Sequence, residues 1–193
     1  MKTLLSLGLV LGLAACASLP TPAPTPASYD LGPLPAARLE APGLALRSLE
    51  VQGAPWLNAT SMQYRLLYAD PARRQSYLES RWAAPPARLL ELELRRALRV
   101  GATPAGQGCR LRLDVDEFIQ VFDGPAQARG VIEARASLLD GRSERLLASQ
   151  PFSLSQPAPE ARAAGGVTAL ATASLQLEQD LARWLAAQAS LCP

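Results

Sequence analysis

Histidine is absent from this chain of 193 residues, and Lys2 is its only lysine. The first absence excludes histidine triads, dyads and metal sites, and the second leaves the body of the chain without an amine for Schiff-base chemistry. An enzyme built from the remaining residues would depend on carboxylates, tyrosines or hydroxyls. No arrangement of such groups indicates catalysis, so we expect a non-enzymatic protein without a metal or a cofactor.

The sequence also has no large excess of positive or of negative residues. The chain carries 19 lysine and arginine residues against 17 acidic residues, for a formal net charge of +2. Nucleic-acid binding requires a basic face or stripe, and a nearly neutral chain of mixed charges does not predict one. We therefore expect no nucleic-acid partner.

Residues 3–15 form a short apolar run that follows the positive charge of Lys2. A membrane-spanning helix needs about 20 apolar residues, so this run is too short to span a bilayer and is typical of a signal peptide. The run ends in Leu13-Ala14-Ala15-Cys16, which resembles the lipobox of bacterial lipoproteins at all four positions. The resemblance implies cleavage after residues 1–15 and lipidation of Cys16. An ordinary secretory signal with an incidental cysteine is the weaker alternative.

Residues 16–28 are predicted to be the lipidated cysteine and a tether. Prolines alternate with small residues here, and this pattern forbids a helix and favours an extended, solvated chain. Ten such residues at about 3.1 Å each would span roughly 30 Å. Ala17 follows the cysteine where an aspartate would be a retention signal, so by analogy with lipoprotein sorting we expect transfer to the outer membrane.

Residues 29–193 are predicted to form one α+β domain. A helix is expected after Pro85-Pro86, because proline is preset for the first helical turn, and another over 166–188, where an apolar stripe continues for five turns. This order predicts a mainly antiparallel sheet with both helices packed on one face. Alternating apolar residues predict strands over 44–52, 62–68, 77–82, 109–122, 128–139 and 145–154.

Several motifs of this region, in their order and spacing, resemble the ABC-type transport auxiliary lipoproteins, relatives of paraquat-inducible lipoprotein C. The resemblance implies a fold similar to the N-terminal domain of TolB and an outer-membrane lipoprotein that faces the periplasm. The motifs are Tyr29-Asp30-Leu31-Gly32, Met62-Gln63-Tyr64-Arg65, Arg81-Trp82-Ala83-Ala84-Pro85-Pro86, Glu117-Phe118-Ile119-Gln120-Val121-Phe122-Asp123 and Leu181-Ala182-Arg183-Trp184.

The resemblance also implies partners. Proteins of this family work with an ABC permease and with a membrane-anchored subunit that carries mammalian-cell-entry domains, in a system that moves lipids between the two membranes. Exposed strand edges could in addition join a second copy of the chain. The leading interpretation is therefore a non-enzymatic auxiliary subunit of a lipid transport system.

Two other function classes remain open. A stand-alone carrier of lipids or other hydrophobic ligands would need an apolar cavity, for which three phenylalanines and two methionines are few. A carboxylate-based cell-wall hydrolase could use Asp114, Asp116, Glu117 and Asp123. Alternation along a strand explains Asp114 and Asp116 more simply, as part of a solvated face.

Cys109 and Cys192 are predicted to form a disulfide. Lipidation removes Cys16 from thiol chemistry and leaves these two cysteines in an oxidising compartment. One begins a predicted strand and the other follows the last predicted helix. In the chain-entropy model, closing so long a loop stabilises by roughly 4 to 5 kcal/mol.

The strand that begins at Cys109 changes its pattern halfway. Apolar residues first hold the odd positions, but Phe118 and Phe122 occupy even ones. A β-bulge near Asp116-Glu117 would rotate the strand and place both rings in the core. If the phase continued instead, Phe118, Gln120 and Phe122 would form an exposed contact for another subunit or for the transporter.

Overall fold

The structure, a computed structural model, describes residues 25–33, 44–100 and 108–192. The predicted signal peptide, Cys16 and residues 17–24 of the predicted tether lie outside these ranges. No helix within them is both long and apolar enough to span a membrane. The first strand begins at Ala27, slightly before the predicted start of the domain at Tyr29.

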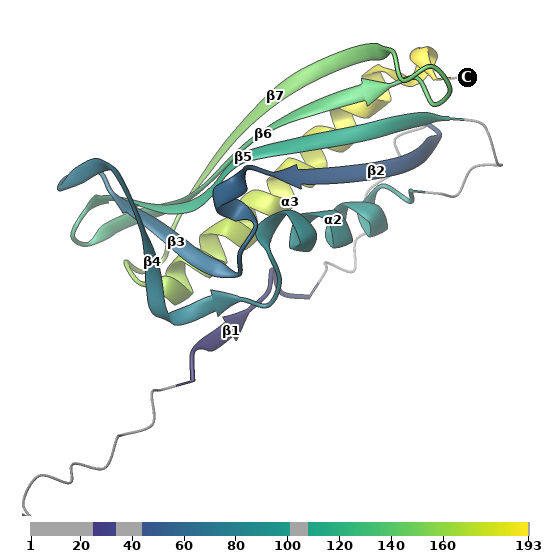
Figure 1. Cartoon of the computed structure of the whole chain (residues 1–193). Coiled ribbons are helices and arrows are strands. Elements are labelled where there is room, and N and C mark those ends of the chain that lie inside the picture. The colour runs from purple at the N-terminus through teal and green to yellow at the C-terminus, as the bar shows by residue number, and fades with distance from the viewer. Residues whose placement is uncertain (1–24, 34–43, 101–107, 193) are drawn as a thin grey trace, which may run out of the picture.

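The described residues form seven strands and two long helices (Figure 1). Helix α2 (Pro86–Ala97) begins at the predicted proline, and helix α3 (Ala163–Ala187) begins slightly before its predicted start. Two short 3-10 helices, η2 (Pro55–Leu57) and η3 (Ala189–Leu191), follow β2 and α3. The strands are β1 (Ala27–Tyr29), β2 (Leu46–Gly53), β3 (Ser61–Leu66), β4 (Asp70–Trp82), β5 (Cys109–Gly124), β6 (Gln127–Leu139) and β7 (Leu146–Pro157).

All seven strands belong to one sheet in the order β1-β4-β3-β5-β6-β7, with β2 beside the first half of β5. β6 pairs with one edge of β5, while β2 and β3 follow each other along its other edge. The β3-β4 hairpin and the β5-β6-β7 meander are antiparallel, as predicted. The pairs β1-β4, β2-β5 and β3-β5 are parallel, which the sequence pattern did not predict.

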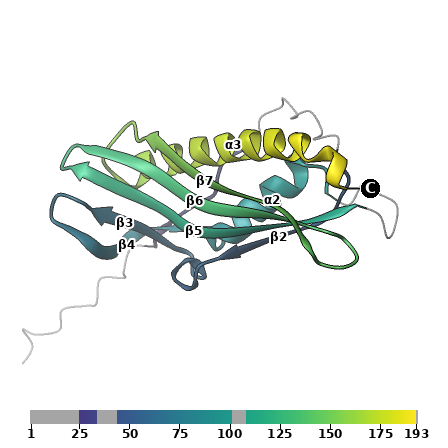
Figure 2. The ribbon, with the colours of Figure 1, turned by 90° about the horizontal axis from the view of Figure 1, so that it is seen from above.

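Both helices pack on one face of this sheet, as predicted (Figures 1 and 2). Leu177, Leu181 and Leu185 follow one another at intervals of four and, with Leu170 and Ala173, give α3 an apolar stripe. The helix lies against β5, β6 and β7. α2 lies mainly against β2. The predicted α+β class is confirmed, with one large core between the sheet and the helices. Its fully buried side chains include Leu90, Leu94, Leu111, Leu113, Ile132, Leu177 and Leu181.

Two glycines let α3 lie close to the sheet. A Cβ atom on Gly130 of β6 would be 2.8 Å from the backbone nitrogen of Leu170 and 2.9 Å from the carbonyl carbon of Ala169. A Cβ atom on Gly166 of α3 would be 2.2 Å from Oε1 of Gln120. Because these separations are shorter than van der Waals contact, both positions require glycine at the present spacing of helix and sheet.

The connection between β6 and β7 is a hairpin, and its turn extends beyond Asp140-Gly141. The Asp140 amide donates a hydrogen bond of 2.9 Å to the carbonyl oxygen of Arg145. The Asp140 carboxylate accepts bonds from the amide and the hydroxyl of Ser143, and Glu144 takes a left-handed φ of 58°. The aspartate side chain, and not the glycine, therefore organises this turn.

Candidate functional site

A β-bulge divides β5 into two halves of opposite phase. Val115 pairs with Ala134 of β6 and Glu117 pairs with Glu133, which leaves Asp116 as the extra residue. One extra residue turns the side chains that follow it to the opposite face of the sheet. The bulge lies where the first of the two interpretations of this strand placed it.

The bulge turns Phe118, Gln120 and Phe122 toward the helices and buries them. Their exposed fractions are 1 %, 0 % and 7 %. The ring of Phe118 packs edge-on against Trp82, with 5.4 Å between centroids, and the ring of Phe122 packs against Tyr64 at 5.8 Å. The interpretation of these three residues as an exposed partner contact is wrong, because the phase of the strand does not continue through the bulge.

Gln120 joins three elements inside the core. The Tyr77 hydroxyl of β4 donates a hydrogen bond of 2.8 Å to Oε1 of Gln120, and Nε2 of Gln120 donates one of 3.2 Å to the carbonyl oxygen of Arg162, just before α3. Burial raises the pKa of the Tyr77 phenol, with a further contribution from Tyr64. Tyr77 therefore remains a donor at neutral pH. The amide fixes the start of α3 relative to β4 and β5, and the sequence contained no signal for this role.

On the opposite face of the sheet, Glu117 binds two arginines of the β3-β4 hairpin. Nη2 of Arg74 lies 2.8 Å from Oε2 of Glu117, and Nη2 of Arg65 lies 3.3 Å from Oε1. Arg74 also donates to Oε1 of Gln63 at 2.8 Å. Its guanidinium lies 5.4 Å from the centre of the Trp56 ring, and Trp56 is 49 % exposed. We call these five residues the Trp56 cluster.

Three of the four acidic residues considered for a hydrolase, Asp114, Glu117 and Asp123, form ion pairs with arginines. Oδ1 of Asp114 lies 2.9 Å from Arg112, and Oδ2 of Asp123 lies 3.0 Å from Arg129. This arrangement favours an ion-paired, solvated face. Within the described ranges, no group of three or more cysteine and carboxylate side chains is placed to hold a metal ion.

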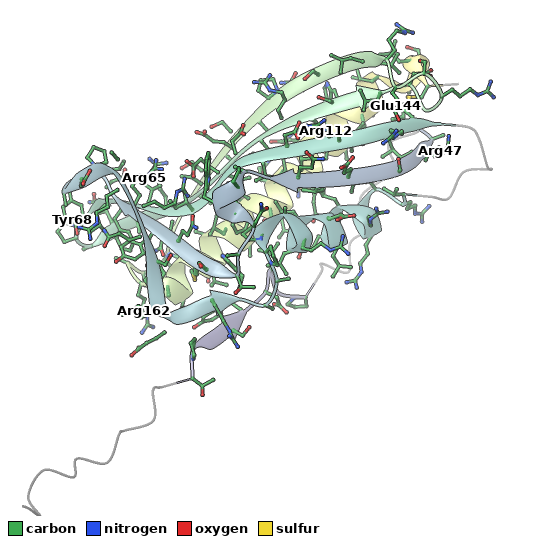
Figure 3. The ribbon with its side chains drawn as sticks, viewed as in Figure 1. Arg47, Arg65, Tyr68, Arg112, Glu144 and Arg162 are labelled. Carbon is green, nitrogen blue, oxygen red and sulfur yellow. A yellow bond between two sulfur atoms is a disulfide. The ribbon has the colours of Figure 1, made fainter. Side chains whose placement is uncertain are left out.

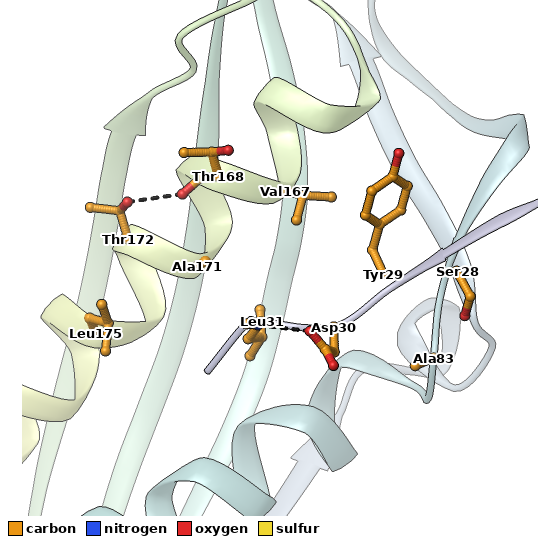
Figure 4. Close-up of a pocket in the computed structure, with 11 residues that line it drawn as sticks. Ser28, Tyr29, Asp30, Leu31, Ala83, Val167, Thr168, Ala171, Thr172 and Leu175 are labelled. Atoms are coloured by element: carbon orange, nitrogen blue, oxygen red, sulfur yellow. Dashed lines mark hydrogen bonds between the residues drawn. The ribbon is translucent and has the colours of Figure 1, made fainter. Parts of the chain in front are cut away.

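An open groove of about 470 Å³ lies between the N-terminal segment and α3 (Figure 4). The hydroxyls of Thr168 and Thr172 on its wall donate to carbonyl oxygens of the preceding helical turn. The Asp30 carboxylate accepts a hydrogen bond of 2.9 Å from the Gly32 amide. With these polar groups bonded within the protein, the groove mainly offers apolar contact. Its apolar lining includes Leu31, Val167, Ala171 and Leu175.

Two glutamates of the helices have unusual environments. Glu178 of α3 is 4 % exposed, and its Oε1 has no hydrogen-bond partner among the described residues. Burial raises the pKa of Glu178 from 4.5 to about 7. The pKa of Glu93 on α2 also rises to about 7, through burial and through the negative charges of Glu178 and Asp30. Sequence reasoning missed this pair because glutamates are common on solvated helices.

A disulfide joins Cys109 and Cys192 in the structure. Their Cα atoms are 5.6 Å apart, and they are separated by 83 positions in the sequence. The bond links the first residue of β5 to the segment after η3. It therefore ties the C-terminal end of the chain to the sheet.

The fold is similar to those of two solved structures. A Xanthomonas campestris protein of the family DUF330 has 23% sequence identity and a TM-score of 0.65, over 88% of this chain and 91% of its own. The crystal structure of an uncharacterized protein has 18% identity and a TM-score of 0.66, over 83% of this chain and 99% of its own. At these identities the likeness shows the fold alone.

The family is shown by sequence. No curated protein matches the chain. The model of the ABC-type transport auxiliary lipoprotein component matches residues 29–182, which include α2, most of α3 and almost all of the sheet. The chain therefore belongs to the family of ABC-type transport auxiliary lipoprotein components.

Proposed function

We propose that this protein is an outer-membrane lipoprotein that serves an ABC-type lipid transport system as a non-enzymatic auxiliary subunit. Lipidated Cys16 and residues 17–28 tether the domain of residues 29–193, which faces the periplasm. Its partners are an ABC permease complex and a membrane-anchored protein with mammalian-cell-entry domains. Together they connect the inner and outer membranes.

The observation that carries this proposal is the extent of the family match. Residues 29–182 contain nearly the whole described fold, and the lipobox and the proline-rich segment lie directly before them in the sequence. The arginine-paired acids of β5 support a role without catalysis.

Two exposed aromatic side chains support a partner contact at the β3-β4 hairpin. Trp56 lies on Arg74 beside this hairpin, and Tyr68, in the turn of the hairpin, is 50 % exposed. Figure 3 labels Tyr68 and Arg65 on this part of the molecule. Tryptophan, tyrosine and arginine supply much of the binding energy of many interfaces. In our proposal these side chains contact the membrane-anchored subunit.

Purification of the tagged full-length chain from its own membranes tests the proposal. We expect the permease and the mammalian-cell-entry-domain protein to be recovered with it. The double variant Trp56→Ala/Tyr68→Ala should reduce this recovery at least about tenfold, because hot-spot side chains contribute about 2 kcal/mol or more each. Its melting temperature should change by only a few degrees.

The matched control is Leu78→Ala, since Leu78 is 91 % exposed on β4 outside the Trp56 cluster. This variant should recover the partners as the native chain does. Equal recovery with the double variant would contradict the proposed contact. Recovery of neither partner under conditions that keep other transporters intact would contradict the proposed function, and an inner-membrane location would contradict the sorting.

The groove beside α3 favours a second candidate, a lipoprotein that binds a lipid or another hydrophobic ligand by itself. Its volume of about 470 Å³ lies within the roughly 300–1,000 Å³ of small-molecule sites. Native mass spectrometry of the purified chain tests this candidate. A stoichiometric lipid that stays bound without the partner proteins would support it, and a chain free of lipid would contradict it.

A further inference from the structure

Glu178 carries a buried carboxyl group whose Oε1 has no hydrogen-bond partner among the described residues. It belongs to α3, where Leu177 and Leu181 enter the main core. Leaving a carboxylate ionised in apolar surroundings without a hydrogen bond or a counter-ion costs several kcal/mol. A carboxyl group in such a place avoids this cost by holding a proton.

A second carboxyl group, that of Glu93 on α2, repels the carboxyl group of Glu178 when both are ionised. Glu93 of α2 is close enough to Glu178 for the two negative charges to repel each other, and Asp30, after β1, adds to the repulsion. Arg96, on the same helix as Glu93, opposes it. These are the charged groups of the described residues that bear on the pair. Three carboxylates against one arginine cannot all be ionised here without strain.

We propose that the contact between α2 and α3 is a proton-dependent clasp. While a proton remains on the Glu93–Glu178 pair, the two helices stay packed together. When both carboxyl groups are ionised, their repulsion and their need for water separate α2 from α3. This inference concerns the domain itself and does not depend on the proposed function.

The direction of the pH effect follows from the two pKa values. Both rise from 4.5 to about 7 in the folded protein. A raised carboxyl pKa means that the closed form binds the proton more tightly than an open form does. The stabilisation is therefore complete below about pH 4.5, is lost as the pH rises toward 7, and is absent above it.

The geometry indicates that α2, and not α3, is the element that moves. α3 packs against β5, β6 and β7, whereas α2 packs mainly against β2. Its polar link to the sheet there is the hydrogen bond of 2.8 Å that Nη2 of Arg95 donates to the carbonyl oxygen of Leu49. Fewer neighbouring elements hold α2, so its local opening needs less free energy.

Hydrogen exchange of the full-length chain tests the clasp. Exchange rates are compared at about pH 5.5 and about pH 8 after division by the intrinsic rate at each pH. Protection of the amides of α2 should fall at least about tenfold between these conditions, since one pKa unit corresponds to a tenfold change in an equilibrium constant. Protection of β6 should change less than about twofold.

The variant Glu93→Gln/Glu178→Gln has no titrating pair, so its protection in α2 should change less than about twofold with pH. Glu79→Gln, at an exposed position of β4, should behave as the native chain does.

A second test uses the native protein and needs no substitution. Carboxyl carbon NMR should show two glutamates that titrate near pH 7. Equal protection of native α2 at both pH values would overturn the proposal, as would titration of all glutamates below about pH 5.

Discussion

At the scale of single residues, Gln120 shows how a polar side chain can determine the position of a helix. Its amide is fully buried, and both of its ends are bonded to groups that other elements supply. The Tyr77 hydroxyl donates its hydrogen bond to this side chain, whereas the Arg162 carbonyl oxygen also accepts a bond of 3.1 Å from the Gly166 amide. Such a residue affects stability through the groups that it would leave unpaired.

We predict that Gln120→Leu lowers the free energy of unfolding by about 1 to 3 kcal/mol, because it leaves the half-buried Tyr77 hydroxyl without its partner. Urea unfolding monitored by circular dichroism measures the change. Gln150→Leu, at an exposed position of β7, is the control and should change stability by less than about 0.5 kcal/mol. A Gln120→Leu variant as stable as the control would show that the amide bridge contributes nothing.

The residues around Gln120 also show the limit of sequence reading. The interruption of alternation in β5 was visible, and so was the possibility of a bulge at Asp116-Glu117. The partners of Gln120 were not, because Tyr77 and Arg162 reach it only after β4 and α3 have packed on β5. The arginines bound to Glu117 were hidden for the same reason, since Arg65 and Arg74 come from a different hairpin.

At the scale of elements, the close contact between α3 and the sheet depends on glycine. Gly130 is the sharper case, because a Cβ atom there would meet backbone atoms of α3 and not the end of a flexible side chain. The helix would have to move outward to admit a methyl group. Such a displacement would also disturb the core that α3 shares with β5 and β6.

We predict that Gly130→Ala lowers the free energy of unfolding by about 1 to 3 kcal/mol, the usual range for overpacking. Thermal and urea unfolding measure the change. Gly124→Ala is the matched control, since its Cβ atom would meet only Oε1 of Gln127 at 3.9 Å. If both variants lost the same stability, the cause would be the loss of glycine itself and not the contact with α3.

Most elements were predictable because each leaves a local pattern in the sequence. Alternation and apolar stripes located the strands and both helices, and Pro86 marked the start of α2. The start of β4 was placed too late, at residue 77, since β4 already begins at Asp70. The parallel pairing of β2 and β3 with β5 was not predictable, because local patterns carry no information about which distant strands become neighbours.

At the scale of the whole molecule, the disulfide between Cys109 and Cys192 closes a loop in which the two cysteines are 83 positions apart. Cys109 lies 1 % exposed in the core at the start of β5, and Cys192 follows the last helical turn. The meander of β5, β6 and β7 and the whole of α3 lie between them in the sequence. Reduction would free this half of the domain in the unfolded chain.

We predict that Cys109→Ser/Cys192→Ser lowers the free energy of unfolding by about 2 to 4.5 kcal/mol, the upper figure being the chain-entropy value for a loop of this length. Urea unfolding with and without reductant measures the loss. Reductant should weaken the native chain and leave the double variant unchanged. Two free thiols in denatured, unreduced protein would contradict the disulfide.

The position of β1 has a mechanical consequence. The chain that leads from Cys16 enters the fold through this strand, which is three residues long and, among the described strands, pairs with β4 alone. If Cys16 carries the proposed lipid anchor, a pulling force there would reach β1 before the other described strands and load its few hydrogen bonds. Ser28 to Gly32 also form one wall of the groove beside α3. In the proposed anchored protein, tension would therefore act on this wall of the groove before it reached the disulfide-linked half of the domain.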